Sequence, residues 1–133
     1  KWVKFSLWDT SGQTMFRSLI ETFFNSVEGC VAVYDVTDRD SYEDVVRWVS
    51  AHPELKVILV GNKADLKDSR EVKTQEGLVT AERHGWQFAE LGFHASSQEI
   101  FVNLSNALSA DEVVENPPVV KSVENDYPCC RLM

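Results

Sequence analysis

Two short polar segments of the sequence carry residue types that could bind a ligand. Residues 8–13 read Trp-Asp-Thr-Ser-Gly-Gln and follow an alternating apolar run, and residues 62–65 read Asn-Lys-Ala-Asp and follow the apolar run at 57–61. Open α/β sheets bind ligands where strands end and loops begin. The two segments therefore predict a binding site at the carboxyl edge of a sheet.

The first segment has the groups that a phosphate and metal site needs. Asp9 offers hard carboxylate oxygens of the kind that Mg²⁺ prefers, directly or through water. Gly12 lets the backbone approach a phosphate oxygen, to which its N–H can donate, and Gln13 can orient a water for in-line attack. The plain alternative is an Asp-Thr-Ser-Gly turn in which Asp9 only caps the backbone.

The second segment has the groups that read a purine base. Asp65 can accept two parallel hydrogen bonds from the N1–H and the exocyclic amine of guanine, a pair of donors that adenine lacks. Asn62 can bridge loops and meet the base edge, and the aliphatic stem of Lys63 can lie across the ring. The plain alternative is an ordinary polar turn after a buried strand.

The hydrophobic pattern predicts the elements that position these segments. Strands are expected at residues 3–9, 30–34, 56–61 and 86–91, and helices at about 19–24, 41–52, 74–84 and 100–108. Ser41 with Asp44 has the spacing of a capping arrangement, Thr74 is a second candidate cap, and Gly85 is a left-handed stop. Strands that alternate with helices predict an α/β fold, with a mostly parallel sheet and helices on both faces.

Composition and charge argue against some classes of function. The chain has 133 residues with 13 Lys and Arg, 21 Asp and Glu and a net charge of −8, which argues against nucleic acid as a partner because phosphate backbones need clustered basic residues. No run of about 18 apolar residues predicts a membrane-spanning helix. Residues 1–109 are expected to form a partial domain, and residues 110–133 a flexible acidic tail that Pro117-Pro118 keeps from being helical.

Several segments together resemble the Rab branch of the Ras-like small GTPases. They are residues 5–13, 16–19, 33–38, 60–66 and 70–72, with the sequences FSLWDTSGQ, FRSL, VYDVTD, VGNKADL and REV. The resemblance covers residues 1 to about 109 and the C-terminal cysteines. It implies a P-loop small-GTPase fold that binds GTP or GDP with Mg²⁺, hydrolyses GTP slowly and regulates vesicle and membrane trafficking.

The resemblance also implies roles for single residues. Gln13 matches the catalytic glutamine of the family, and Asp9 and Gly12 match the residues beside the Mg²⁺ ion and the phosphates, with Asp9 holding the metal through water. Residues 62–65 match the guanine-binding motif Asn-Lys-x-Asp.

The resemblance further implies partners and a location. Effectors, exchange factors and activating proteins would bind the switch loop around residues 10–18 and Trp8, although Trp8 is equally compatible with core packing. A prenyltransferase would modify the tail. The attached lipid would hold the protein on the cytoplasmic face of intracellular membranes, with a cytosolic pool.

The C-terminal cysteines, Cys129 and Cys130, match two lipidation patterns. Cys130 and the three residues after it form a C-a-a-X box ending in Met, which favours farnesyl. An adjacent cysteine pair is also the Rab pattern, in which both thiols take geranylgeranyl chains. The acidic tail lacks the basic patch that would supplement a single chain, which favours modification of both cysteines. Two unmodified thiols are the plain alternative.

The chain also departs from the family pattern. Ser11 and Thr14 stand where the family has Ala and Glu, and residues 91–95 read Leu-Gly-Phe-His-Ala after Glu90, where the motif Glu-Thr-Ser-Ala-Lys is expected, so no binding residue is assigned there. No G-x-x-x-x-G-K-[ST] phosphate loop occurs.

The first strand, phosphate loop, first helix and first switch of the family are therefore expected to be missing, and with them the natural N-terminus. We expect this chain alone to bind GTP weakly or not at all and to be inactive, while the complete parent is a GTPase. A degenerate or truncated adaptor that binds partners without hydrolysing a nucleotide is the alternative.

Overall fold

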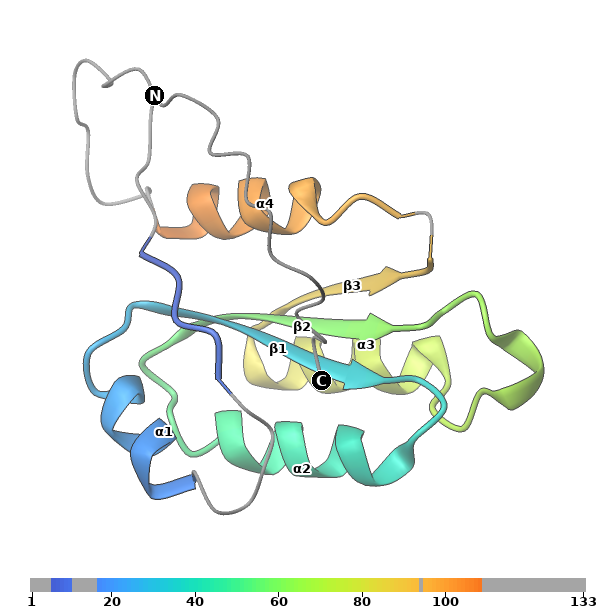
Figure 1. The fold of residues 1–133 in the computed structure, drawn as a ribbon, viewed down its shortest axis with the longest axis horizontal. Coiled ribbons are helices and arrows are strands. Elements are labelled where there is room, and N and C mark those ends of the chain that lie inside the picture. Colours follow the sequence, from blue (N-terminus) through green and yellow to red (C-terminus); the bar gives the residue numbers. More distant parts are fainter. Residues whose placement is uncertain (1–5, 11–16, 94, 109–133) are drawn as a thin grey trace, which may run out of the picture.

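A computed structural model of the chain describes residues 6–10, 17–93 and 95–108. Helices and strands alternate along it (Figure 1). The elements are α1 Arg17–Phe24, β1 Gly29–Asp35, α2 Arg39–Val49, β2 Lys56–Asn62, the short 3₁₀ helix η2 Lys67–Ser69, α3 Thr74–His84, β3 Gln87–Leu91 and α4 Gln98–Leu108. The alternation confirms the α/β class that the hydrophobic pattern predicts.

The three strands within the described residues form a parallel sheet in the order β1-β2-β3. Their last residues are in register, because Asp35 of β1 pairs with Asn62 of β2, and Asn62 pairs with Leu91 of β3. The carboxyl ends of the strands therefore share one edge of the sheet, and the loops that follow them are neighbours.

Helices cover both faces of this sheet (Figure 1). One part of the core lies on the face covered by α2 and α3, and it includes Leu59 and Tyr42. The other part lies beneath α4 and includes Val60 and Leu104. Strand β2 buries apolar side chains on both faces, which explains its uninterrupted apolar sequence.

The helix ends agree only in part with the sequence-based expectations. Helix α2 begins earlier than expected, and its cap is Asp38, whose Oδ1 accepts a hydrogen bond from the N–H of Ser41 at 3.2 Å. Ser41 is therefore inside the helix, because the Asp three residues before it takes the capping position. Thr74 likewise follows the cap residue Lys73, whereas Gly85 ends α3 in the left-handed conformation, at φ 71°, as predicted.

The strand predicted at residues 3–9 is not present in the part that the structure describes. Residues 6–10 are exposed and have no regular structure, and residues 1–5 lie outside the described ranges. An alternating pattern forms a strand only when a neighbouring strand takes its hydrogen bonds, and β1 pairs with β2 alone among the described strands. The Trp8 ring contacts Phe23 of α1 with ring centroids 5.0 Å apart but is 61% exposed, so core packing is the wrong interpretation for it.

The space beside Gly77 in α3 is too small for even a methyl side chain. A Cβ there would lie 2.5 Å from Cε2 of Phe88 and 2.7 Å from the hydroxyl of Tyr34. Replacing a helical glycine with alanine ordinarily stabilises a protein, but we expect Gly77→Ala to lower the free energy of unfolding by about 1–3 kcal/mol because the core is overpacked. Urea unfolding would measure this, with the exposed Gln75→Ala as the control. A Gly77→Ala protein as stable as wild type would contradict the packing.

Candidate functional site

Backbone hydrogen bonds join the loops at the carboxyl edge of the sheet. The N–H of Val36, just after β1, donates to the carbonyl of Asn62 at 3.0 Å. The N–H of Ala64 donates to the carbonyl of Leu91, the last residue of β3, at 2.9 Å. The loop at 62–65 is therefore attached on one side to β1 and on the other to β3.

Lys63 has a backbone conformation that few residues with a side chain adopt. Its φ of 62° lies in the left-handed region, and its carbonyl accepts a hydrogen bond from the N–H of Leu66 at 2.9 Å. The Nζ atom of Lys63 is 2.5 Å from Oδ2 of Asp35, the last residue of β1. This ion pair fixes the end of a side chain that is otherwise half exposed.

Asp35 is a site residue that the sequence analysis did not identify. Its Oδ1 accepts hydrogen bonds from the N–H of Thr37 at 2.8 Å and from the Thr37 hydroxyl at 2.7 Å, while Oδ2 contacts Lys63. Burial raises the pKa of the Asp35 carboxyl, but the hydrogen bonds from Lys63 and Thr37 outweigh it and hold the pKa below its ordinary value. The signal available in the sequence was its place directly after the apolar run at residues 30–34.

Asp65 contacts the segment in which no binding residue was assigned. Its Oδ1 accepts a hydrogen bond from the backbone N–H of Phe93 at 2.9 Å. Gly92 permits this approach, because a Cβ there would lie 3.2 Å from the same oxygen. The structure thus brings a backbone donor beside Asp65, and the available signal was the glycine two residues after Glu90.

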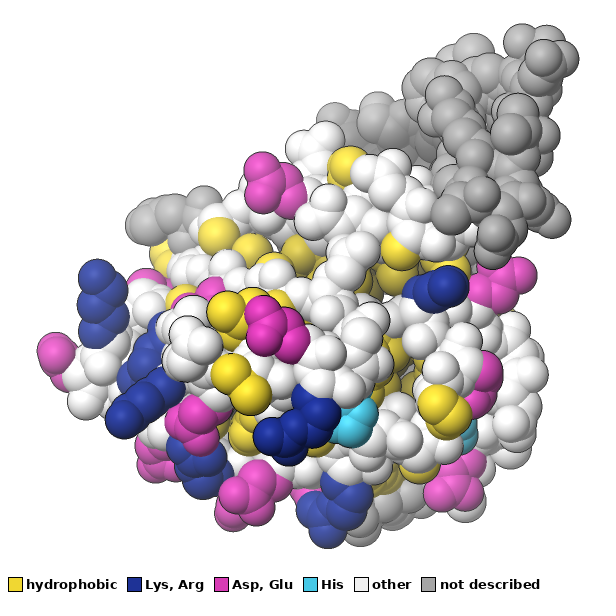
Figure 2. All heavy atoms as spheres, turned by 180° about the vertical axis from the view of Figure 1, so that it is seen from behind, with side chains coloured by type: hydrophobic (Ala, Val, Ile, Leu, Met, Phe, Trp, Pro, Cys, Tyr) yellow, Lys and Arg dark blue, Asp and Glu magenta, His cyan; other side chains and the backbone are white. Residues whose placement is uncertain are grey.

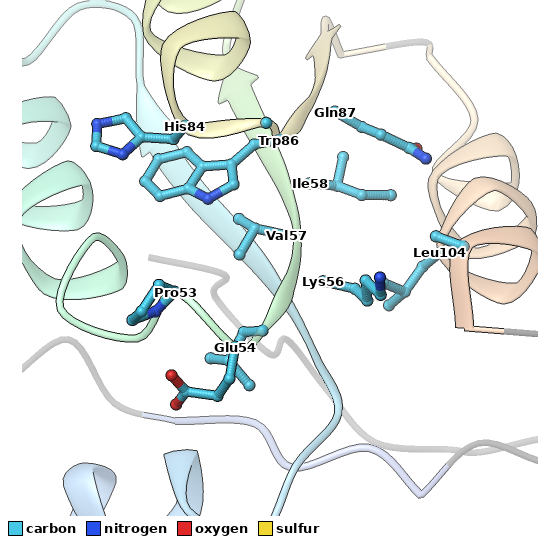
Figure 3. A pocket seen from close by; sticks show the side chains of 12 residues that line it. Pro53, Glu54, Lys56, Val57, Ile58, His84, Trp86, Gln87 and Leu104 are labelled. Carbon is cyan, nitrogen blue, oxygen red and sulfur yellow. The ribbon is translucent and has the colours of Figure 1, made fainter. Parts of the chain in front are cut away.

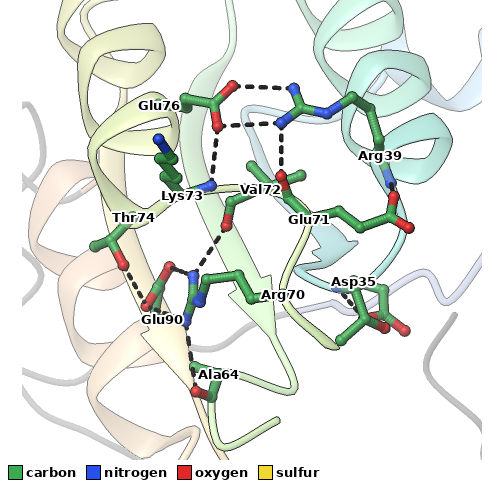
Figure 4. Close-up of polar contacts among 11 residues, drawn as sticks. Asp35, Arg39, Ala64, Arg70, Glu71, Val72, Lys73, Thr74, Glu76 and Glu90 are labelled. Carbon is green, nitrogen blue, oxygen red and sulfur yellow. Dashed lines mark hydrogen bonds and ion pairs between the residues drawn. The ribbon is translucent and has the colours of Figure 1, made fainter. Parts of the chain in front are cut away.

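A largely buried ion pair lies beneath these loops (Figure 4). The guanidinium of Arg70 forms a bidentate pair with the carboxylate of Glu90 in β3: Nη1 donates to Oε1 at 2.7 Å and Nη2 donates to Oε2 at 3.0 Å. The same guanidinium donates to the carbonyls of Val72 at 3.1 Å and Ala64 at 3.4 Å. The hydroxyl of Thr74 donates to Glu90 at 3.1 Å, so the pair joins α3, β3 and the loop at 62–65.

A second forked ion pair joins α2 to α3 (Figure 4). Arg39 donates to the two carboxylate oxygens of Glu76 at 2.9 and 3.1 Å, and also to the carbonyl of Glu71 at 2.7 Å. Glu76 accepts a further bond from the N–H of Lys73 at 3.0 Å. The hydrogen bond from Arg39, followed by the one from Lys73, lowers the pKa of Glu76 to about 2.

The other residues proposed from the sequence are not joined to this site by the structure. Asp9 is described and exposed, whereas Gly12, Gln13, Cys129 and Cys130 lie outside the described residues, so their roles stay predictions. Among the described residues, no three His, Cys, Asp or Glu side chains gather where they could hold a metal. The Mg²⁺ role of Asp9 therefore rests on the resemblance. No helix within the described ranges has the length and apolar character to cross a membrane.

Two further features of the surface are a mixed distribution of charge and a pocket. Lys and Arg side chains are interspersed with Asp and Glu over the face seen in Figure 2, rather than collected into one patch. A pocket lined by Pro53, Trp86, Leu104 and their neighbours opens beside Lys56, where β2 begins (Figure 3). Asn62 ends the same strand, so this pocket lies at the opposite end of the sheet from the candidate site.

Comparison with known proteins identifies the family. The model of the Ras family matches residues 1–110. The chain belongs to the Ras family. It is 39% identical over 113 residues to Ras-related protein Rab-11B of Dictyostelium discoideum, covering 80% of this chain and 51% of that protein. It is 43% identical over 93 residues to Ras-related protein Rab-4 of the same organism, covering 66% and 45%.

A plant relative gives the same picture. The chain is 39% identical over 95 residues to Ras-related protein RABA6a of Arabidopsis thaliana, covering 68% of this chain and 41% of that protein. These matches confirm a Rab-like member of the Ras superfamily with its α/β fold. The chain spans about half the length of the curated relatives it matches.

The Arg39–Glu76 pair predicts a specific acid response. Because the pKa of Glu76 is lowered from 4.5 to about 2, its ion pair stabilises the fold above pH 4.5, and this stabilisation is lost as the pH falls through about 2. NMR titration of the Glu76 carboxyl carbon should show a midpoint near pH 2. In Arg39→Met the midpoint should move back toward 4.5, and in Arg47→Met, which removes the partner of Asp44 instead, it should not. A wild-type midpoint near 4.5 would contradict the pairing.

Proposed function

We propose that this protein is a guanine-nucleotide switch of the Rab type, and that residues 62–65 read the base. One arrangement carries the proposal: the carboxylate of Asp65, the side chain of Lys63 and the N–H of Phe93 gather at the carboxyl edge of the sheet. This is the edge at which open α/β sheets bind ligands.

The hydrogen-bonding groups around Asp65 suit guanine. The carboxylate is exposed and accepts a hydrogen bond from Phe93, and an ionised carboxylate has about four acceptor positions, which leaves room for the two donors of the base. The Phe93 N–H is a donor that the carbonyl oxygen of guanine could share. Lys63 has its Nζ fixed on Asp35, so its aliphatic stem is available to lie across the ring.

The phosphate side of the proposal rests on Asp9, Gly12 and Gln13. Asp9 would hold Mg²⁺ through water, Gly12 would donate its N–H to a phosphate oxygen, and Gln13 would orient the water that attacks in slow GTP hydrolysis. Bound Mg²⁺ would neutralise charge on the phosphates. Membership of the Ras family supports this assignment of GTP, GDP and Mg²⁺.

The cellular role proposed is regulation of vesicle and membrane trafficking, which the Rab names of the relatives support. Effectors, exchange factors and activating proteins would bind the loop around residues 10–18 and Trp8, whose exposed ring suits a contact surface. A prenyltransferase would modify the tail at 110–133, and the lipid would hold the protein on the cytoplasmic face of intracellular membranes, with a cytosolic pool. No observation favours an adaptor without hydrolysis over this function.

Base selectivity tests the proposed site. Asp65→Asn replaces an acceptor oxygen with a donor that would face the exocyclic amine of guanine, whereas xanthine has an oxygen there. We expect the variant to lose affinity for GDP and gain affinity for XDP, with a change in discrimination of about 1–3 kcal/mol or more. The affinities for GDP and XDP would be measured by NMR titration of the 133-residue chain, at nucleotide concentrations up to millimolar so that weak binding is detected.

Asp68→Asn in η2 is the matched control for this experiment, because it removes another exposed carboxylate outside residues 62–65. It should leave the preference for GDP over XDP as in wild type. An Asp65→Asn chain that still prefers GDP to the same extent would exclude Asp65 as the residue that reads the base.

Lipid attachment is tested by intact-mass measurement of the protein recovered from membranes of cells that express it. We expect two geranylgeranyl additions, because one chain gives only marginal membrane binding and the tail is acidic. Cys130→Ser should release most of the protein, Cys129→Ser should weaken attachment, and Cys30→Ser should change neither the number of lipid additions nor the attachment. One farnesyl with loss of the last three residues would favour the C-a-a-X route, and membrane-bound protein without any addition would refute lipid anchoring.

A further inference from the structure

The Arg70–Glu90 pair connects the two loops that would contact a base. Arg70 donates to the carbonyl of Ala64, which lies between Lys63 and Asp65. Glu90 is three residues before Phe93, whose N–H donates to Asp65. We propose that Arg70 is a positioning residue that holds these two loops at a fixed separation before the nucleotide binds, an inference that rests on the guanine site proposed above.

The burial of the pair supports this role. The side chains of Arg70 and Glu90 are only 18% and 17% exposed. Arg39 and Glu76, which form the other forked pair, are both 38% exposed. A largely buried charge needs its partners in place, since removing one leaves the other uncompensated. Arg70 and Glu90 therefore constrain their surroundings more strongly than an exposed pair would.

The number of bonds also distinguishes Arg70 from a simple counter-charge. Its guanidinium reaches both oxygens of Glu90 and two backbone carbonyls, those of Val72 and Ala64. A lysine would supply the same charge as a compact ammonium, but it could not present a planar fork to the carboxylate and reach the carbonyls as well. The position of the loop therefore depends on the shape of the side chain and not on its charge alone.

Holding the loops in place without ligand would favour binding. A site whose loops are already ordered loses less conformational entropy when the ligand arrives. Asp65 and Phe93 are on different loops, and the hydrogen bond between them requires these loops to stay together. Loss of Arg70 should therefore increase the mobility of these two loops, while the hydrophobic clusters on both faces of the sheet stay packed.

Amide hydrogen exchange of the ligand-free chain tests this inference directly. In Arg70→Lys, the amides of Ala64 and Phe93 should exchange roughly tenfold faster or more, because charge-assisted bonds that hold their loops are lost. Amides of β2 such as those of Leu59 and Val60 should change little. Arg39→Lys is the matched control, since it alters the other forked pair and should leave Ala64 and Phe93 protected.

The outcomes separate a positioning role from a merely structural one. If Ala64 and Phe93 keep their wild-type exchange rates in Arg70→Lys, or speed up only in proportion to Leu59 and Val60, the proposal is overturned. Glu90→Gln provides a second variant, in which the carboxylate charge is removed and the same two amides should again exchange faster.

Titration with GMP, followed by NMR, then connects loop order to binding. The dissociation constant should rise by roughly fivefold or more in Arg70→Lys and stay near wild type in Arg39→Lys. An unchanged constant in Arg70→Lys would overturn the positioning role. A wild-type chain that gives no shift with GMP would contradict the guanine site itself, and the exchange rates measured without ligand would still decide whether Arg70 orders the loops.

Discussion

The central position of β2 is the constraint on which the candidate site depends. Residues 57–61 of this strand are buried, and a strand that is apolar on both faces requires cover on both faces and pairing along both edges. β1 and β3 supply the pairing, α2 and α3 cover one face, and α4 covers the other. The loop after β2 is therefore held between the loops of its neighbours, which gives residues 62–65 contacts on both sides.

Charged pairs continue this arrangement beyond the end of the sheet. Asp35 of β1 fixes Lys63 from one side, and Glu90 of β3 fixes Arg70, and through it the Ala64 carbonyl, from the other. The charges of Arg70 and Glu90 are largely buried and need such partners, whereas Lys63 is half exposed. The polar loop thus has its side chains and carbonyls held by the same two strands that pair with β2, which is a suitable basis for a site that discriminates between bases.

The sequence predicted the parts of the fold that local patterns determine. The apolar runs gave β1 and β2, and Gly85 ended α3 as its freedom at positive φ suggests. Partners distant in sequence were not predictable in this way. The alternating residues 3–9 specify a face but not a neighbouring strand, and Arg70 is 20 positions from Glu90. The role of Asp35 likewise depends on its ion pair with Lys63, a residue of the next loop.

The most direct test of the account compares guanine with adenine on the wild-type chain. NMR spectra would be recorded with GMP and with AMP, which differ in the base alone. A guanine site formed by these loops predicts shifts with GMP confined to the residues around 35–37, 62–66 and 91–93, and little response to AMP, because adenine lacks the donor pair that Asp65 would accept. Equal responses to the two nucleotides, or shifts centred on the pocket beside Trp86, would contradict it.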